Sequence, residues 1–267
     1  MPHAAGLWYE WDGPEDGEVL ILSAGLGGAG AYWAPNLATF AARYRVLLYD
    51  HRGTGRSDRA LPDHVTVEDM ARDVLGLMDA LGIGRARFLG HALGGLIGLA
   101  LAEAAPERVD RLVVFNGWAS LDAYTARCFD VRLALLRDSG AAMYLRAQPI
   151  FLYPPDWITV ASDELDRLAA KQLEEFPGAA AVEKRVAAAR EWDARARLPG
   201  IAAPTLVLAT ADDALVPSHC ARALAEGLPN ATRMLQFCGG HASNIVEPED
   251  FHARVLPWLA GETFPEE

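Results

Sequence analysis

The sequence predicts an α/β fold, in which a mostly parallel sheet is flanked by helices and carries an inserted helical cap. Three observations support this prediction. Short apolar runs alternate with amphipathic helical patterns along most of the chain. A strand pattern at residues 87–89 runs through a glycine-rich turn directly into an apolar helix. The strand pattern then disappears from residue 118 to residue 197. We therefore expect a core at residues 1–117 and 198–267 and a helical cap at 118–197.

Each predicted strand is a short apolar run. A run that is apolar at nearly every position is typical of a strand covered on both faces, and residues 18–23 (Glu-Val-Leu-Ile-Leu-Ser) have this pattern. Residues 7–11 alternate between apolar and polar residues, as expected of an edge strand. The predicted strands are residues 7–11, 18–23, 45–49, 88–89, 111–116, 205–209 and 233–237.

The predicted helices have apolar stripes and recognisable ends. Thr66 and Asp69 resemble a capping box, and the helix after them ends before Gly82. Pro106 ends the helix that follows the glycine-rich turn. The other predicted helices are residues 248–259 in the core and 126–136, 163–173 and 180–195 in the cap, with a break at 148–157.

Composition limits the partners. The 267 residues carry a net charge of −12, which argues against binding to nucleic acid or to an anionic membrane. The longest uncharged apolar run, 92–102, is half the roughly 20 residues of a membrane span, and residues 1–6 do not resemble a signal peptide. We expect a cytoplasmic protein with reduced cysteines, a small-molecule substrate and no cofactor. The oligomeric state stays open, with a homodimer among the possibilities.

A glycine-rich loop at residues 25–30 matches the Gly-x-Gly-x-x-Gly pattern of dinucleotide-binding folds, and Asp50 lies about where such folds place their ribose acid. Two features argue against that interpretation. Asp50 opens an Asp-x-Arg-Gly-x-Gly-x-Ser turn that a dinucleotide site does not need, and the glycine-rich turn around Ala92 follows the next strand. The alternative is a loop whose backbone N–H groups face a developing oxyanion.

The turn at Gly90-His91-Ala92-Leu93-Gly94 has the pattern of a nucleophile elbow, Gly-x-Ser-x-Gly, with alanine in place of serine. Gly90 and Gly94 fit this interpretation because the strained turn brings their backbones close together. Alanine keeps the Cβ, and therefore the strain, but it has no nucleophilic atom. No covalent ester can form at Ala92.

Two loops after late strands carry a carboxylate and a histidine. The first holds Asp212 and Asp213, and the second holds His241. Both follow the elbow, and the order of elbow, acid and histidine is that of the α/β-hydrolase triad. With these residues the chain resembles the α/β-hydrolase superfamily over its whole length. It is most similar to the family of pyrimidine-utilisation protein D of the bacterial uracil-degrading Rut pathway. The motifs that carry the resemblance are residues 25–28 with 32–33, 49–55, 90–94, 116–118, 147–154 and 239–242.

The resemblance implies a role for each matched position. His241 would be the general acid and base, and Asp213 would orient it, because the Asp-x-x-Val-Pro sequence from Asp213 to Pro217 fits the acid better than Asp212 does. The backbone N–H groups of Leu26 and Leu93 would form an oxyanion hole. The family is described as acting on carbamate or aminoacrylate, products of ring opening.

Other positions have two interpretations each. We expect His91 to be a packing residue, with a second catalytic base as the alternative. On the cap, Arg127 and Arg132 are expected on a solvated helix face, and the alternative is contact with a substrate carboxylate. Gln148 and Trp157 line the substrate pocket or serve the fold alone. A metal site is not expected, since the histidines lack short ligand spacing.

Ala92 leaves three hypotheses for function. In the favoured one, the protein is a hydrolase that uses His241 and Asp213 for acid–base catalysis without a nucleophile, in uracil catabolism. In the second, it is a catalytically inactive binding protein that keeps the fold. In the third, Ala92 replaces the serine of an ordinary esterase by engineering.

Overall fold

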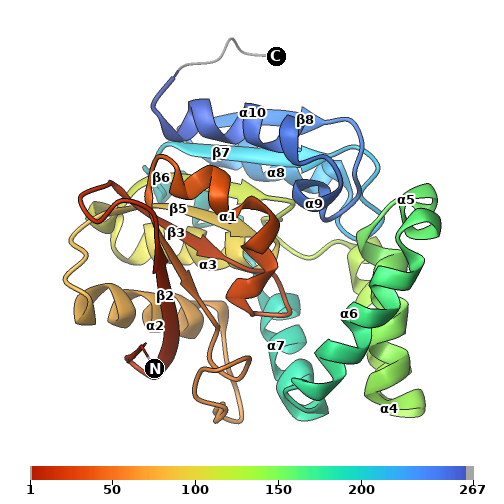
Figure 1. The fold of residues 1–267 in the computed structure, drawn as a ribbon. Coiled ribbons are helices and arrows are strands. Elements are labelled where there is room, and N and C mark those ends of the chain that lie inside the picture. Colours follow the sequence, from red (N-terminus) through yellow and green to blue (C-terminus); the bar gives the residue numbers. More distant parts are fainter. Residues whose placement is uncertain (1, 263–267) are drawn as a thin grey trace.

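The computed structural model describes residues 2–262, which are organised around an eight-stranded sheet with the order β1-β2-β4-β3-β5-β6-β7-β8 (Figure 1). β1 pairs with β2 and β2 with β4 in antiparallel fashion, and the other neighbours are parallel. The predicted mostly parallel sheet is thereby confirmed. The strands are β1 (His3–Ala4), β2 (Leu7–Asp12), β3 (Val19–Ser23), β4 (Arg45–Tyr49), β5 (Ala86–His91), β6 (Val109–Phe115), β7 (Thr205–Thr210) and β8 (Ala231–Gln236).

Helices cover both faces of the sheet. α1 and α10 pack on one face, and α2, α3 and α8 pack on the other (Figure 1). The helices of the core are α1 (Ala34–Ala41), α2 (Val67–Ala80), α3 (Leu93–Ala104), α8 (Ser218–Gly227), α9 (Ser243–Val246) and α10 (Pro248–Leu259). Three short 3-10 segments connect elements: η1 (Gly30–Trp33), η2 (Pro106–Arg108) and η3 (Leu198–Gly200).

The alternation of side chains along the strands builds two apolar layers. In β3, Leu20 and Leu22 pack under α1 and α10, while Ile21 faces the side of α2 and α3. All three side chains are fully buried. Successive strand residues point to opposite faces, so a continuous apolar run is what a doubly covered sheet requires.

The segment expected to form a cap contains four helices: α4 (Ala123–Leu152), α5 (Pro155–Val160), α6 (Ser162–Glu174) and α7 (Ala179–Glu191). Figure 1 shows them grouped together to one side of the sheet. α4 changes direction at Gly140, whose φ of 82° is not helical. The limits assigned to core and cap remain a prediction.

Two sequence-based boundaries in the cap are wrong. The break expected at residues 148–157 begins only at Tyr153, because α4 continues through Pro149 and closes its last turn with a hydrogen bond from Tyr153 N–H to the Pro149 carbonyl. The helix expected to reach Arg195 ends at Glu191, since Trp192 has extended backbone angles. The capping box at Thr66 and Asp69 is confirmed. In residues 2–262, no helix is long and apolar enough to cross a membrane.

Candidate active site

The elbow lies at the carboxyl end of β5, between β3 and β6. Ala92 has φ 48° and ψ −114°, a conformation that residues with a Cβ adopt only under strain. A Cβ at Gly90 would lie 2.2 Å from the Gly94 carbonyl oxygen, and one at Gly94 would lie 2.4 Å from the Ser23 carbonyl oxygen. Both glycines are therefore required by the close packing of the turn.

His241 and Asp213 form a buried pair above this edge of the sheet. Asp213 follows β7 and His241 follows β8, and the His241 Nδ1 to Asp213 Oδ2 distance is 2.7 Å. The side chains are 3% and 0% exposed. A carboxylate can only accept here, so Nδ1 donates to Asp213 and Nε2 is the ring atom left to exchange a proton. Within residues 2–262, the hydrogen bond of the His241 ring is made through Nδ1, and Nε2 forms none.

The two neighbouring aspartates, Asp212 and Asp213, have different hydrogen-bond partners. Asp213 Oδ1 accepts hydrogen bonds from the backbone N–H groups of Leu215 and Val216 at 2.7 and 2.8 Å, which leaves Oδ2 for the imidazole. Asp212 instead accepts from the N–H groups of Gly239 and Gly240. Asp213 therefore orients the imidazole, whereas Asp212 shapes the loop that carries it.

Two side chains hold the backbone carbonyl group of His241 in place. Its carbonyl oxygen lies 2.9 Å from both His91 Nε2 and Asn116 Nδ2. Asn116 has a positive φ of 51° and also accepts from Thr210 N–H, so it links the ends of β6 and β7 to the histidine loop. The sequence pointed to Asn116 only as part of a common motif and gave no role for it.

His91 has a defined tautomer. Because Nε2 faces a carbonyl, it must donate, and the lone pair is on Nδ1. Nδ1 is buried and has no hydrogen-bond partner in the described chain. Burial, and next the neighbouring His241, lower the pKa of His91 well below its ordinary value, so the ring is neutral. It stacks on Tyr32 with centroids 4.9 Å apart. These contacts favour the packing interpretation of His91.

The backbone N–H groups of Leu26 and Leu93 have no hydrogen-bond acceptor in the described part of the chain. A Cβ placed on Gly25, next to Leu26, would lie 3.6 Å from the Ala92 Cβ, so this loop reaches the elbow. Leu93 begins α3, where the first N–H groups have no intrahelical partner. The two N–H groups are therefore available as donors, and their role in an oxyanion hole stays a prediction.

The Asp50 carboxylate forms hydrogen bonds within the fold. Its Oδ1 accepts from Gly30 N–H at 2.8 Å, and its Oδ2 accepts from the backbone N–H and the guanidinium of Arg56. The carboxylate therefore anchors the glycine-rich loop to the turn after β4. This occupies the group that a dinucleotide site would use for ribose.

Arg132 is buried, contrary to the expectation of a solvated face. Its side chain is on α4, and the residue is 6% exposed. The expectation failed because α4 changes direction at Gly140, and its later part lies against this side chain. Nη2 donates to Tyr144 Oη and to Gln148 Oε1, and the aromatic ring of Phe151 lies 5.8 Å from Cζ. Its Nε is buried without a partner in the described chain. No carboxylate in this part of the protein forms an ion pair with the guanidinium.

The other three candidate residues of the cap differ from Arg132 in their exposure and contacts. Arg127 is exposed and bonds only the Ala123 carbonyl of its own helix, so its side chain is on a solvated face as expected. Gln148 is half-buried and joins Arg132 to the Tyr144 carbonyl. Trp157 packs on Tyr153 at 4.5 Å, in an apolar cluster that includes Ala242 beside the histidine.

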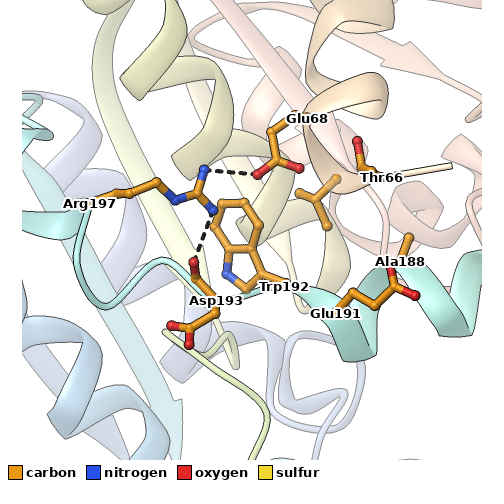
Figure 2. A pocket seen from close by; sticks show the side chains of 8 residues that line it. Thr66, Glu68, Ala188, Glu191, Trp192, Asp193 and Arg197 are labelled. Carbon is orange, nitrogen blue, oxygen red and sulfur yellow. Dashed lines mark hydrogen bonds and ion pairs between the residues drawn. The ribbon is translucent and has the colours of Figure 1, made fainter.

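Two surface hollows share no residue with this site. The first, of about 260 Å³, lies between the start of α2 and the end of α7 (Figure 2). There Arg197 binds Glu68 and Glu103 and lies over the Trp192 ring. The other two carboxylates of the lining, Asp193 and Glu191, lie against Arg195 and His64.

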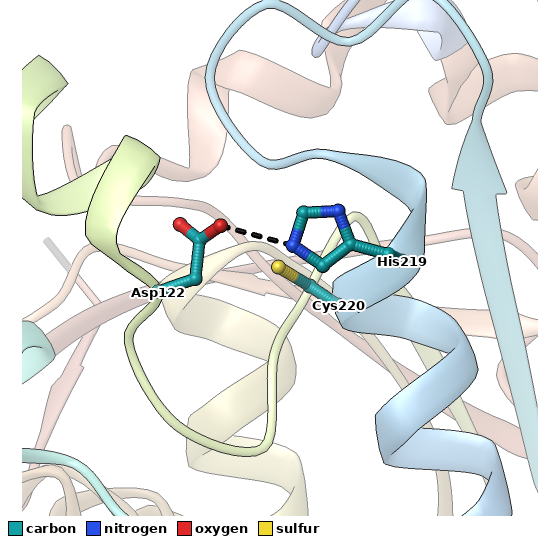
Figure 3. Close-up of side chains that lie close together, drawn as sticks. All are labelled: Asp122, His219 and Cys220. Atoms are coloured by element: carbon teal, nitrogen blue, oxygen red, sulfur yellow. Dashed lines mark hydrogen bonds and ion pairs between the residues drawn. The ribbon is translucent and has the colours of Figure 1, made fainter.

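The second hollow, of about 280 Å³, contains Asp122, His219 and Cys220 (Figure 3). Their ligand atoms all lie within 4.8 Å of one another, a grouping that the sequence spacing did not anticipate. His219 Nε2 is 3.0 Å from Asp122 Oδ2, and Asp122 Oδ1 caps α4 through Thr125 N–H. Burial, followed by Asp122 and Asp213, raises the pKa of the Cys220 thiol to about 12. The hydrogen bonds of Asp122 to Thr125 and His219 give this group a role in the fold, as the cap of α4.

Comparison with known proteins agrees with this fold. The family model described as the alpha/beta hydrolase fold matches residues 18–152. A protein of Caulobacter sp. (strain K31) named "Putative carbamate hydrolase RutD" is 49% identical, over 96% of this chain and 97% of its own. A protein of the same name from Variovorax paradoxus (strain S110) is 47% identical, over 97% and 98%. Among solved structures, the enol-lactonase from Burkholderia xenovorans LB400 has a TM-score of 0.85 at 29% identity and covers 95% of this chain and 96% of its own.

Proposed function

This chain belongs to the α/β-hydrolase family, and from that membership we propose that it hydrolyses carbamate in pyrimidine catabolism without a nucleophilic side chain. The observation that carries the proposal is an oriented imidazole, His241 held by Asp213 at 2.7 Å, beside an elbow whose central residue is Ala92. The names of relatives that are 44–49% identical support carbamate as the substrate.

Carbamate needs a proton and no acyl-enzyme. Protonated His241 donates its Nε2 proton to the carbamate nitrogen. The C–N bond then breaks, its electron pair stays on nitrogen, and ammonia and carbon dioxide leave. Water then returns a proton to the imidazole, and the hydroxide that remains combines with the released carbon dioxide to form bicarbonate. Asp213 accepts the Nδ1 hydrogen bond throughout and stabilises the imidazolium. A positioned acid of this kind contributes typically 10²–10⁴-fold in rate.

The carboxylate of the substrate needs hydrogen-bond donors or a positive charge from the protein. The free N–H groups of Leu26 and Leu93 support a role in holding a carboxylate oxygen near the elbow. Arg132 supplies a buried positive charge that has only neutral partners within residues 2–262. A buried guanidinium without a carboxylate is costly for folding, and an anionic substrate would offset that cost.

The same arrangement suits aminoacrylate as a second substrate. Protonation at carbon converts this enamine into an imine, which water hydrolyses to malonic semialdehyde and ammonia. The observation that favours it is the buried Arg132 on the cap, which has no carboxylate partner within residues 2–262 and can hold the carboxylate bonded to the carbon that gains the proton. In both reactions, His241 is the proton donor.

The test is ammonia release above the spontaneous rate. Carbamate is formed from ammonia and bicarbonate at high pH, the pH is lowered by rapid mixing, and decay is followed with the purified protein and with His241→Ala. Aminoacrylate, generated by an upstream enzyme, is tested in parallel. We expect acceleration by the wild type that the variant loses. No acceleration with either compound would overturn the proposal and favour a binding protein.

A further inference from the structure

We propose that Arg185, on cap helix α7, is a positioning residue that holds the loop at residues 25–30 in the geometry needed for an oxyanion hole. This inference rests on the proposed function, since it assigns a role within the same site. α7 is one of the cap helices in Figure 1, and its Arg185 reaches the core loop 159 residues earlier in the sequence. Sequence reasoning did not select this residue.

The contacts of Arg185 converge on one carbonyl group. Its Nε and Nη2 donate to the Leu26 carbonyl oxygen at 3.1 and 3.0 Å. Two hydrogen bonds from one planar group restrict rotation of the peptide unit that follows Leu26. The expected oxyanion donor is the N–H of the peptide unit that precedes Leu26, so the guanidinium fixes the backbone directly beside it.

The loop is packed against the guanidinium as well as bonded to it. A Cβ on Gly28 would lie 2.8 Å from Arg185 Nη2 and 2.7 Å from Thr54 Oγ1. Gly28 also has a φ of 73°, which a residue with a side chain adopts only with strain. The glycine therefore lets the backbone approach the arginine closely.

Arg185 is anchored in turn to the sheet. Nη2 donates to His51 Nδ1 at 3.0 Å, His51 Nε2 lies 3.1 Å from Ser23 Oγ, and Ser23 is at the end of β3. His51 must be neutral to accept this bond. Burial, and next the charge of Arg185, lower the pKa of His51 well below its ordinary value. A chain of hydrogen bonds therefore connects α7 to the end of β3.

The free-energy cost of burying Arg185 argues against a purely structural role for its contacts. Arg185 is 1% exposed, and its acceptors are the carbonyls of Leu26 and Arg52 and the neutral ring of His51. Burying a guanidinium without a carboxylate costs several kcal/mol in general, and well-packed apolar residues often replace buried ions without loss of stability. A positive charge next to the loop also stabilises negative charge that develops at the neighbouring N–H groups.

Three variants test the inference: Arg185→Met, Arg185→Lys and the control Lys184→Met. Lys184 is adjacent on α7, but its Nζ contacts Asp63 and the Leu61 carbonyl instead of the loop. We expect Arg185→Met to lower kcat about 10- to 100-fold with little change in KM, because a displaced donor acts mainly in the transition state. Arg185→Lys should recover part of the rate, and Lys184→Met should match the wild type.

Hydrogen exchange gives a readout that does not depend on turnover. In Arg185→Met, amides of residues 25–30 should exchange faster, while those of β7 stay unchanged. If wild-type protein does not accelerate carbamate decay, the proposed function fails, and exchange still decides the role of Arg185. Unchanged exchange together with unchanged kcat in folded Arg185→Met would overturn the inference. If Arg185→Met does not fold, Arg185→Lys is compared with Lys184→Met by the same two measurements.

Discussion

The Nδ1 atom of His241 lies 2.7 Å from Oδ2 of Asp213, and two backbone N–H groups hold the other oxygen of the same carboxylate. This arrangement fixes both the orientation of the ring and its tautomer. It leaves Nε2 as the ring atom that can exchange a proton with a ligand.

We expect Asp213→Asn to lower the rate about 10²- to 10⁴-fold, because the asparagine amide can offer its N–H₂ group to Nδ1 and so favour the wrong tautomer. His241→Ala should lose the acceleration entirely. The measurement is ammonia release under single-turnover conditions.

Asp212→Asn is the matched control for the acid. Its amide oxygen can still accept from the N–H groups of Gly239 and Gly240, so activity should stay near that of the wild type. If Asp212→Asn and Asp213→Asn lose activity equally, the assignment of the acid is wrong.

The second prediction concerns Ala92. A serine-directed fluorophosphonate should leave the wild type unlabelled, because the elbow has no oxygen to attack the probe. Ala92→Ser should become labelled and show a burst with an activated ester, since turn, imidazole and free N–H groups are already in place. Intact-protein mass spectrometry measures the labelling.

Two results would contradict this. Stoichiometric labelling of the wild type at the elbow would exclude a site without a nucleophile. A folded Ala92→Ser protein that is never labelled would mean that His241 does not reach the position of the serine oxygen.

The third prediction concerns the buried charge of Arg132. If Arg132 holds the substrate anion, Arg132→Met should raise KM about 10- to 100-fold, since a hydrogen bond to a charged group contributes about 1.5–3 kcal/mol. The free energy of unfolding should change little or increase, because an unpaired buried charge is removed. Steady-state kinetics and urea unfolding measure the two quantities.

Arg127→Met is the control, as Arg127 is on the same helix but exposed. It should match the wild type in both measurements. Equal KM values for the wild type and Arg132→Met would remove Arg132 from substrate binding.

The fourth prediction is a pH dependence of stability. His91 is neutral in the fold because its pKa lies well below the ordinary value, whereas in the unfolded chain it gains a proton below about pH 6.5. The unfolded state therefore binds more protons in this range, and stability falls as the pH decreases from about 6.5 toward the folded pKa. One such group contributes a slope of about 1.4 kcal/mol per pH unit.

His91→Gln should reduce this slope by about that amount between pH 6.5 and 5, in denaturant unfolding at several pH values. His64→Gln is the control, since the His64 side chain is 69% exposed. The loss of a hydrogen bond to the His241 carbonyl lowers the stability of His91→Gln at every pH, so only the slope is compared. An unchanged slope would show that His91 does not carry this linkage.

Much of the fold could be predicted from sequence because local rules decide it. The apolar runs and the elbow glycines each follow from a short segment, whereas the roles of Asp213 and His241 were implied by the resemblance to a known family. The packing around Gly90 and Gly94 is what the turn requires.

The long-range polar contacts could not be predicted in the same way. Arg132 looked like a surface residue because helix periodicity gives no information on which face a cap helix turns toward its neighbours. Arg185 contacts a loop 159 residues away, and nothing in its local sequence indicates this. α4 continues through Pro149 although proline inside a helix costs about 3 kcal/mol, so contacts outside the local sequence must offset that cost.

The strained turn at Ala92 has an evolutionary consequence. Every alanine codon becomes a serine codon by a single change of its first base, so mutation continually produces genes that encode serine at the centre of this elbow. Such a variant needs no rearrangement of the backbone, because Ala92 already has the φ of 48° that the elbow demands. Selection for ester cleavage could therefore begin from this gene with its first adaptive step as a point mutation.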